Sequence, residues 1–116
     1  KDLDELFGGG KSIHEPPVRA IYKTKAEKTR ATLSVGVSAP KKLHKLAVTR
    51  NLLKRRMREA YRLNNHQLKQ TLKDSDIQLN VMFVYTSKQI LSYNEIEDKI
   101  KVILNRLNSM FGKSAE

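Results

Sequence analysis

The chain has 116 residues, 39% of them hydrophobic, with no Cys and a formal net charge of +11 at pH 7. This length predicts one domain over residues 1–116 with one modest core, and the lack of Cys excludes disulfides and thiolate zinc sites and fits a reducing cytoplasm. No apolar run approaches the roughly 20 residues of a membrane-spanning helix, and no signal-peptide pattern opens the chain, so we expect neither feature.

The first residues predict a short helix. Leu3, Leu6 and Phe7 recur at helical spacing, and the glycines at 8–10 end the helix because they tolerate positive φ. Since the chain begins with Lys1 rather than Met, we expect this start to be trimmed.

Two strands are predicted next. After a break at Pro16 and Pro17, residues 18–24 form a candidate strand, and residues 31–38 alternate apolar with small polar side chains, as a strand with one buried face does. We expect the two to pair as a hairpin. The charged connection, 25–30, predicts a solvated loop.

The last third of the chain predicts a strand and a helix. Residues 77–85 are nearly continuous in apolar side chains from Val81 onward, which predicts a central strand covered on both faces. Ser92 and Glu95 form a capping box for a helix with one apolar face. With the basic helix that precedes this strand, the order predicts an α+β fold, a two-layer sandwich of helices against a small mixed sheet.

The basic segment between residues 41 and 62 carries nine Lys and Arg against one acid, Glu59. We expect a helix over about 49–66. At about 100° per residue, one apolar stripe contains Leu53, Met57, Ala60 and Tyr61 and should be buried. The other side is a contiguous strip of Asn51, Lys54, Arg55, Arg58 and Arg62.

Like charges at this spacing repel one another until phosphates arrive, and a merely solvated helix face would interleave Glu with Lys. The strip therefore predicts contact with nucleic acid and disfavours the alternative of a merely solvated helix face. A membrane-surface helix is disfavoured because the apolar side is small and lacks Trp and Phe. A DNA-binding helix-turn-helix is disfavoured because Ala39 and Pro40, with a strand ahead of them, precede the basic helix.

Other motifs give no catalytic or metal site. Gly10-Lys11-Ser12 resembles the end of a nucleotide-binding loop, but Glu5 stands where that loop needs Gly. The three His residues lie far apart in sequence and are expected on the surface or in loops. Capping and turn formation explain the acids at helix starts and turns, so we expect no catalytic side chains: Asp2, Asp4, Glu5, Asp74, Asp76, Glu95, Glu97 and Asp98.

Several motifs together resemble the protein subunit of bacterial ribonuclease P across nearly the whole chain. They are Val35-Gly36-Val37-Ser38, Lys41-Lys42, Ala47-Val48-Thr49-Arg50-Asn51, Lys54-Arg55 and Arg58-Glu59. The chain departs from the family pattern at Leu52, where the family has Arg, at Pro40, where it often has Ser, and at Leu3, where it often has an aromatic ring. Arg56, which the family often lacks, is a candidate replacement for the missing Arg.

The resemblance implies an α-β-β-β-α-β-α order, with a short strand near residues 11–13 and a left-handed crossover through the basic helix. It also implies that a partner RNA removes the 5′ leader from precursor tRNA with magnesium bound mainly by that RNA, while the chain alone is non-catalytic and is assigned no metal of its own. A ribosomal or general RNA-binding protein remains the alternative.

The resemblance implies two binding surfaces. Residues on the basic segment would contact the catalytic RNA and nearby leader: Lys41, Lys42, Arg50, Asn51, Lys54, Arg55, Arg58 and Arg62. A second surface would form a cleft for the single-stranded leader: Leu3, Phe7, Tyr22 and Ser38. A core position is the alternative for Phe7 and also for Tyr22, whose face depends on the register of its strand.

Overall fold

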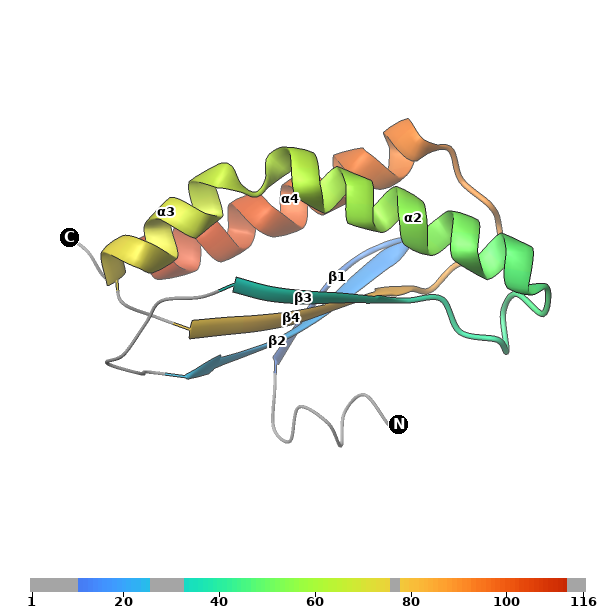
Figure 1. Ribbon diagram of the computed structural model, residues 1–116, viewed down its shortest axis with the longest axis horizontal. Coiled ribbons are helices and arrows are strands. Elements are labelled where there is room, and N and C mark those ends of the chain that lie inside the picture. Colours follow the sequence, from blue (N-terminus) through green and yellow to red (C-terminus); the bar gives the residue numbers. More distant parts are fainter. Residues whose placement is uncertain (1–10, 26–32, 76–77, 113–116) are drawn as a thin grey trace.

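The computed structural model describes residues 11–25, 33–75 and 78–112 (Figure 1). The predicted helix around Leu3 and Phe7 and the predicted loop after residue 25 lie outside these residues. The described elements form a four-stranded sheet in the order β1-β2-β4-β3, with three helices on one of its faces. In chain order they are β1 (Lys11–Glu15), β2 (Val18–Lys25), β3 (Leu33–Ser38), α2 (Ala47–Asn64), α3 (His66–Ser75), β4 (Gln78–Tyr85) and α4 (Tyr93–Gly112).

The strand pairing differs from the predicted hairpin between residues 18–24 and 31–38, which is wrong. β2 pairs with β1 and β4, both antiparallel, and β3 pairs with β4 in parallel. β4 therefore separates β2 from β3. β4 is an inner strand of the sheet, as its apolar run predicted, whereas the alternation in β3 identifies a strand without identifying its partner. β1 confirms the short strand that the family resemblance implied.

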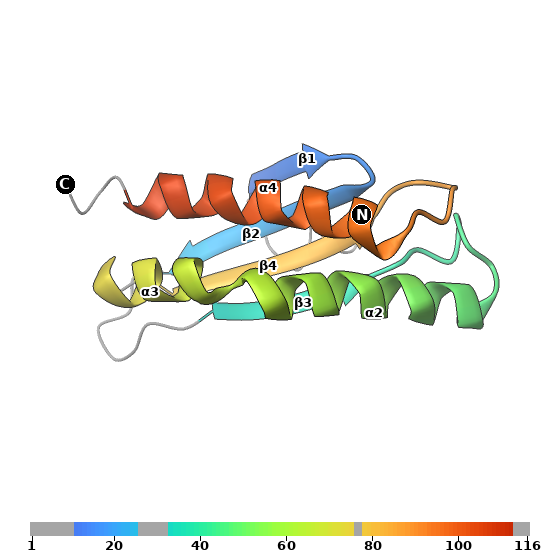
Figure 2. The same ribbon diagram turned by 90° about the horizontal axis from the view of Figure 1, so that it is seen from above.

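The connection from β3 to β4 passes through α2 and α3 and is left-handed. In Figure 2, where the helices lie in front of the sheet, β3 and β4 both run from left to right and β4 lies above β3. This sense is the opposite of that in about 98% of such connections. It agrees with the expectation taken from the family resemblance.

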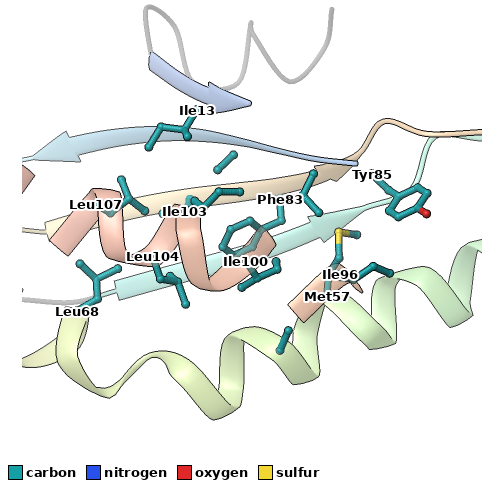
Figure 3. Packing of buried hydrophobic residues seen from close by; sticks show 14 of the residues in the cluster. Ile13, Met57, Leu68, Phe83, Tyr85, Ile96, Ile100, Ile103, Leu104 and Leu107 are labelled. Atoms are coloured by element: carbon teal, nitrogen blue, oxygen red, sulfur yellow. The ribbon is translucent and has the colours of Figure 1, made fainter. Parts of the chain in front are cut away.

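The core lies between the sheet and the three helices (Figure 3). Alternate β4 residues point into it, from Leu79 to Tyr85, and α4 supplies the apolar face predicted from its periodicity. The fully buried α4 side chains are Ile96, Ile100, Ile103 and Leu107. Burying a side chain of this size contributes about 1.5–3 kcal/mol, so this layer fixes how each helix is rotated about its axis.

The face of the sheet away from the helices carries the other half of the strand residues. On β4, Val84 is buried there, whereas Asn80 and Met82 are half-buried, so the helices cover only one of the two faces that we expected to be covered. Gly36 faces Met82 across the β3–β4 pair, and a Cβ at Gly36 would lie 2.9 Å from Met82 Cε. Glycine at this position therefore makes room for the methionine side chain.

The basic helix has the predicted length but begins and ends two residues earlier, and a second helix follows it. α2 ends at Asn64 rather than near residue 66, and α3 begins after Asn65, whose carbonyl accepts the Lys69 N–H at 3.0 Å. α3 buries Leu68 and Leu72 against the core, and these two apolar residues were too few to predict it. Before α4, the predicted capping box is confirmed, with Ser92 N–H donating to Glu95 Oε1 at 3.1 Å and Glu95 N–H to Ser92 Oγ at 3.3 Å.

Candidate nucleic-acid interface

The rotation of α2 is set by its buried side chains. Leu53, Met57 and Ala60 are fully buried, as the periodicity predicted. The opposite side of the helix is therefore turned to solvent, where it carries a set that we call the cationic strip: Asn51, Lys54, Arg55 and Arg58. Lys54 is half-buried and the other three are exposed. Within the described residues, no carboxylate forms an ion pair with the three cations of this strip.

Arg62 extends the strip but carries its own counter-charge. Its Nε and Nη2 donate to Glu59 Oε1 and Oε2 at 3.1 and 2.6 Å, in a two-pronged pair between exposed side chains. The hydrogen bond from Arg62 lowers the pKa of Glu59, and the same bond raises the pKa of Arg62. Arg62 must therefore share or leave Glu59 to contact a phosphate.

Arg50, predicted as an RNA contact, is turned toward the chain itself. Its Nη1 donates to the carbonyls of His44 and Lys45, at 3.1 and 2.7 Å. These two bonds hold the loop before α2 against the first turn of the helix. The residue is half-buried, so its guanidinium organises the loop that precedes the cationic strip.

The loop before α2 presents Lys41, Lys42 and Lys45 to solvent. It is fixed at its centre by His44, which is 7% exposed and whose Nε2 lies 2.7 Å from the Ser87 carbonyl. His44 was expected as a surface or loop residue. It lies in a loop but is buried, because its ring packs 5.7 Å from that of Tyr85. The other two histidines, His14 and His66, are exposed, as expected.

Arg56 fastens α2 to the segment between β4 and α4. Its Nη1 donates to the Leu91 carbonyl, while the Leu91 N–H donates to Tyr85 Oη at 3.0 Å. Tyr85 Oη in turn donates to the Gln89 carbonyl at 2.5 Å. Arg56 therefore lies outside the cationic strip, and its guanidinium is bonded to its own chain instead of being presented to a partner in place of the cation missing at Leu52. Its position beside the apolar stripe was the only signal of this role in the sequence.

The predicted leader cleft is not brought together among the described residues. Tyr22 packs on the helix side of the sheet, where its hydroxyl donates to Met110 Sδ at 3.6 Å. Ser38 lies on the other side, because it pairs in register with Val84. Leu3 and Phe7 lie outside the described residues.

The sheet face away from the helices, which we call the opposite face, carries two exposed cations that the sequence reasoning missed. Arg19 and Lys23 pair in register with Val84 and Asn80, so they share this face with Ser38. Strand alternation predicts that they lie on the other side of β2 from Val18 and Ala20. Which side of the sheet this is becomes clear only from the strand pairing. The same face also carries Ser12, His14, Ile21, Ser34, Gly36, Gln78 and Met82.

The described acids do not form a metal site. In residues 11–25, 33–75 and 78–112, no three His, Asp or Glu side chains come close enough to hold a metal ion together. Glu15 instead pairs with Arg106 at 3.1 Å, as Glu59 does with Arg62. None of the described helices has both the length and the apolar character needed to cross a membrane.

The sequence comparisons with known proteins all match one protein family. The ribonuclease P family model matches residues 1–108. The ribonuclease P protein components of two Porphyromonas gingivalis strains, ATCC 33277 and W83, are each 33% identical to this chain over 114 residues. The match covers 98% of this chain and 83% of each relative.

Solved structures show the same fold. The RNase P protein from Thermotoga maritima superposes with a TM-score of 0.68 at 19% identity, covering 91% of both chains. That of Staphylococcus aureus gives a TM-score of 0.65 at 19% identity, covering 90% of this chain and 87% of the other.

Proposed function

The chain belongs to the ribonuclease P protein family, and from this premise we propose that its cationic strip binds the phosphates of ribonuclease P RNA. A ribonuclease P protein component is a subunit of an endoribonuclease that acts in tRNA processing and has an RNA partner. The proposal concerns which side chains of this chain contact RNA, and what they contribute.

The observation that carries the proposal is the unbalanced charge on a helix whose rotation is fixed. Arg58 lies four residues from Lys54 and three from Arg55, spacings at which like charges on a helix repel, and no described carboxylate offsets them. Buried Leu53 and Met57 prevent the helix from turning these charges away. Phosphates relieve the repulsion and release condensed counterions as they are neutralised.

We propose that the opposite face binds the leader of precursor tRNA. Arg19 and Lys23 provide exposed cations on the same face as Ser38, with β4 between them, and a single-stranded backbone requires such cations. Leu3 and Phe7, which precede β1, remain predicted contacts. Tyr22 faces α4 and is assigned to the core instead of to the leader.

Bond cleavage is assigned to the partner RNA with its magnesium, and this chain contributes binding. In support, Glu15 and Glu59 are paired with arginines, so neither is available to hold a metal or to move a proton without losing its partner. The alternative, a general RNA-binding protein without a role in tRNA processing, would show the same strip.

The test compares two triple variants that remove equal charge. The first is Lys54→Gln/Arg55→Gln/Arg58→Gln, and the matched control is Lys69→Gln/Lys73→Gln/Lys101→Gln, which changes exposed cations on α3 and α4. Affinity for ribonuclease P RNA is measured over a range of KCl concentrations. Each lost phosphate contact lowers the slope of log K against log salt by about 0.7 to 0.9 in magnitude, so the strip variant should lose about 2 to 3. Equal losses in the two variants would contradict the assignment.

A further inference from the structure

Two apolar side chains at the start of α2 are exposed to an unusual degree. Val48 is 79% exposed and Leu46 is 71% exposed, whereas the next large hydrophobic residue in the described part of the chain, Ile90, is 53% exposed. Ala47 between them is also exposed. We call these three residues the apolar tip. Isolated exposed hydrophobic residues are ordinary, but three in succession inside the most basic segment are not.

The apolar tip projects past the sheet. In Figures 1 and 2 the first turn of α2 extends beyond the ends of β3 and β4, so no strand lies beneath it. Leu46 precedes the helix with extended backbone (φ −78°, ψ 129°), and its side chain makes no capping hydrogen bond. Neither Leu46 nor Val48 belongs to the core cluster. The fold therefore does not require apolar residues here.

The tip is continuous with the cationic strip. Val48 precedes Asn51 by three residues and Arg55 by seven, so the three side chains lie on one line along the helix. Lys41, Lys42 and Lys45 approach from the loop. An RNA backbone that lies along the strip thus reaches the tip.

The charges around the tip decide which partner fits it. A protein groove or a lipid interior would have to cover an apolar surface that directly follows a loop with three exposed lysines, at the cost of removing those charges from water. An RNA offers anionic phosphates for the lysines and, where a nucleotide is unstacked, an apolar base face within a few ångströms of them. In other nucleic-acid complexes, aliphatic side chains insert as apolar wedges between bases.

We propose that the apolar tip packs against the face of an unstacked nucleobase in the RNA that the cationic strip holds. The inference rests on the proposed function and adds to it a contact that is not ionic. Such a contact releases no counterions, so it strengthens binding equally at all salt concentrations. Phosphate contacts, in contrast, weaken as salt rises.

The test is the double variant Leu46→Ser/Val48→Ser, with Leu63→Ser as the control on the same helix, since Leu63 is also exposed, at 49%. We expect the double variant to lose about tenfold in affinity for ribonuclease P RNA at every KCl concentration, with the salt slope unchanged. Leu63→Ser should change affinity less than about twofold. Equal effects of the two variants, or a reduced slope in the double variant, would overturn the inference.

The charge variant Arg55→Gln separates this inference from the function on which it rests. If Arg55→Gln lowers the salt slope and the apolar variant has no effect, the strip binds RNA and the tip does not. If neither has an effect, the proposed function itself fails. Methylation of unpaired bases by dimethyl sulfate provides a second measurement at saturating protein. The parent chain should protect an unpaired adenine or cytosine that Leu46→Ser/Val48→Ser leaves reactive, and identical protection by both would count against a base contact.

Discussion

Arg55 and Arg56 are neighbours with opposite surroundings, so exchanging each for Gln should separate RNA binding from stability. Arg55 is exposed on the cationic strip, and Arg56 is half-buried with its Nη1 donating to the Leu91 carbonyl. Arg56→Gln leaves that carbonyl without its charged donor. A hydrogen bond to a charged group contributes about 1.5–3 kcal/mol when buried, and half-exposure reduces this to about 1–2 kcal/mol of unfolding free energy.

For a chain of this size, that loss lowers Tm by roughly 3 to 8 °C. Arg55→Gln breaks no described hydrogen bond, so its Tm should stay within about 1 °C of the parent. In RNA binding the order reverses, since Arg55→Gln should reduce the salt slope by about 0.7 to 0.9 and Arg56→Gln should leave it unchanged. Thermal unfolding followed by circular dichroism and binding at several KCl concentrations measure both quantities. If Arg56→Gln changed the slope and left Tm intact, our assignment of the two side chains would be reversed.

Four further substitutions test other parts of the structure. Tyr85→Phe removes a hydroxyl bonded to two backbone groups and should lower the unfolding free energy by about 1–3 kcal/mol in urea titrations; a loss below about 0.5 kcal/mol would mean that water replaces it. Glu59→Gln frees Arg62 and should increase RNA affinity and raise the salt slope by up to about 0.9, whereas weaker binding would show that Glu59 itself contacts the partner. Arg19→Gln should reduce the preference for precursor tRNA with a leader over tRNA without one. Tyr22→Ala should lower Tm without changing that preference. If Tyr22→Ala reduced the preference and Arg19→Gln did not, Tyr22 would belong to the leader site.

Local sequence pattern predicted the features that depend on residues close together in the chain. The buried side of α2 followed from the spacing of Leu53 and Met57, and the capping box at Ser92 from four adjacent residues. Both are set within one or two helical turns, where periodicity determines which side chains share a face. The exposed strip followed for the same reason.

Features that depend on distant partners were not predicted. The sequence pattern does not show that β4 lies between β2 and β3. Without that pairing, the side of the sheet on which Tyr22 lies could not be assigned. Arg50 and Arg56 belong to the same basic run as Arg55, yet each is directed to a backbone carbonyl. Charge pattern alone does not distinguish an arginine that binds carbonyls of its own chain from one that is free for phosphate.

Reconstitution tests the central claim most directly. A bacterial ribonuclease P RNA is combined with this chain at low millimolar magnesium, and release of the 5′ leader from precursor tRNA is measured. We predict that the chain accelerates cleavage, that Lys54→Gln/Arg55→Gln/Arg58→Gln largely removes the acceleration, and that the chain without the RNA releases no leader. Leader release by the purified chain alone, or full acceleration by the triple variant, would contradict the claim that the cationic strip acts by docking onto a catalytic RNA.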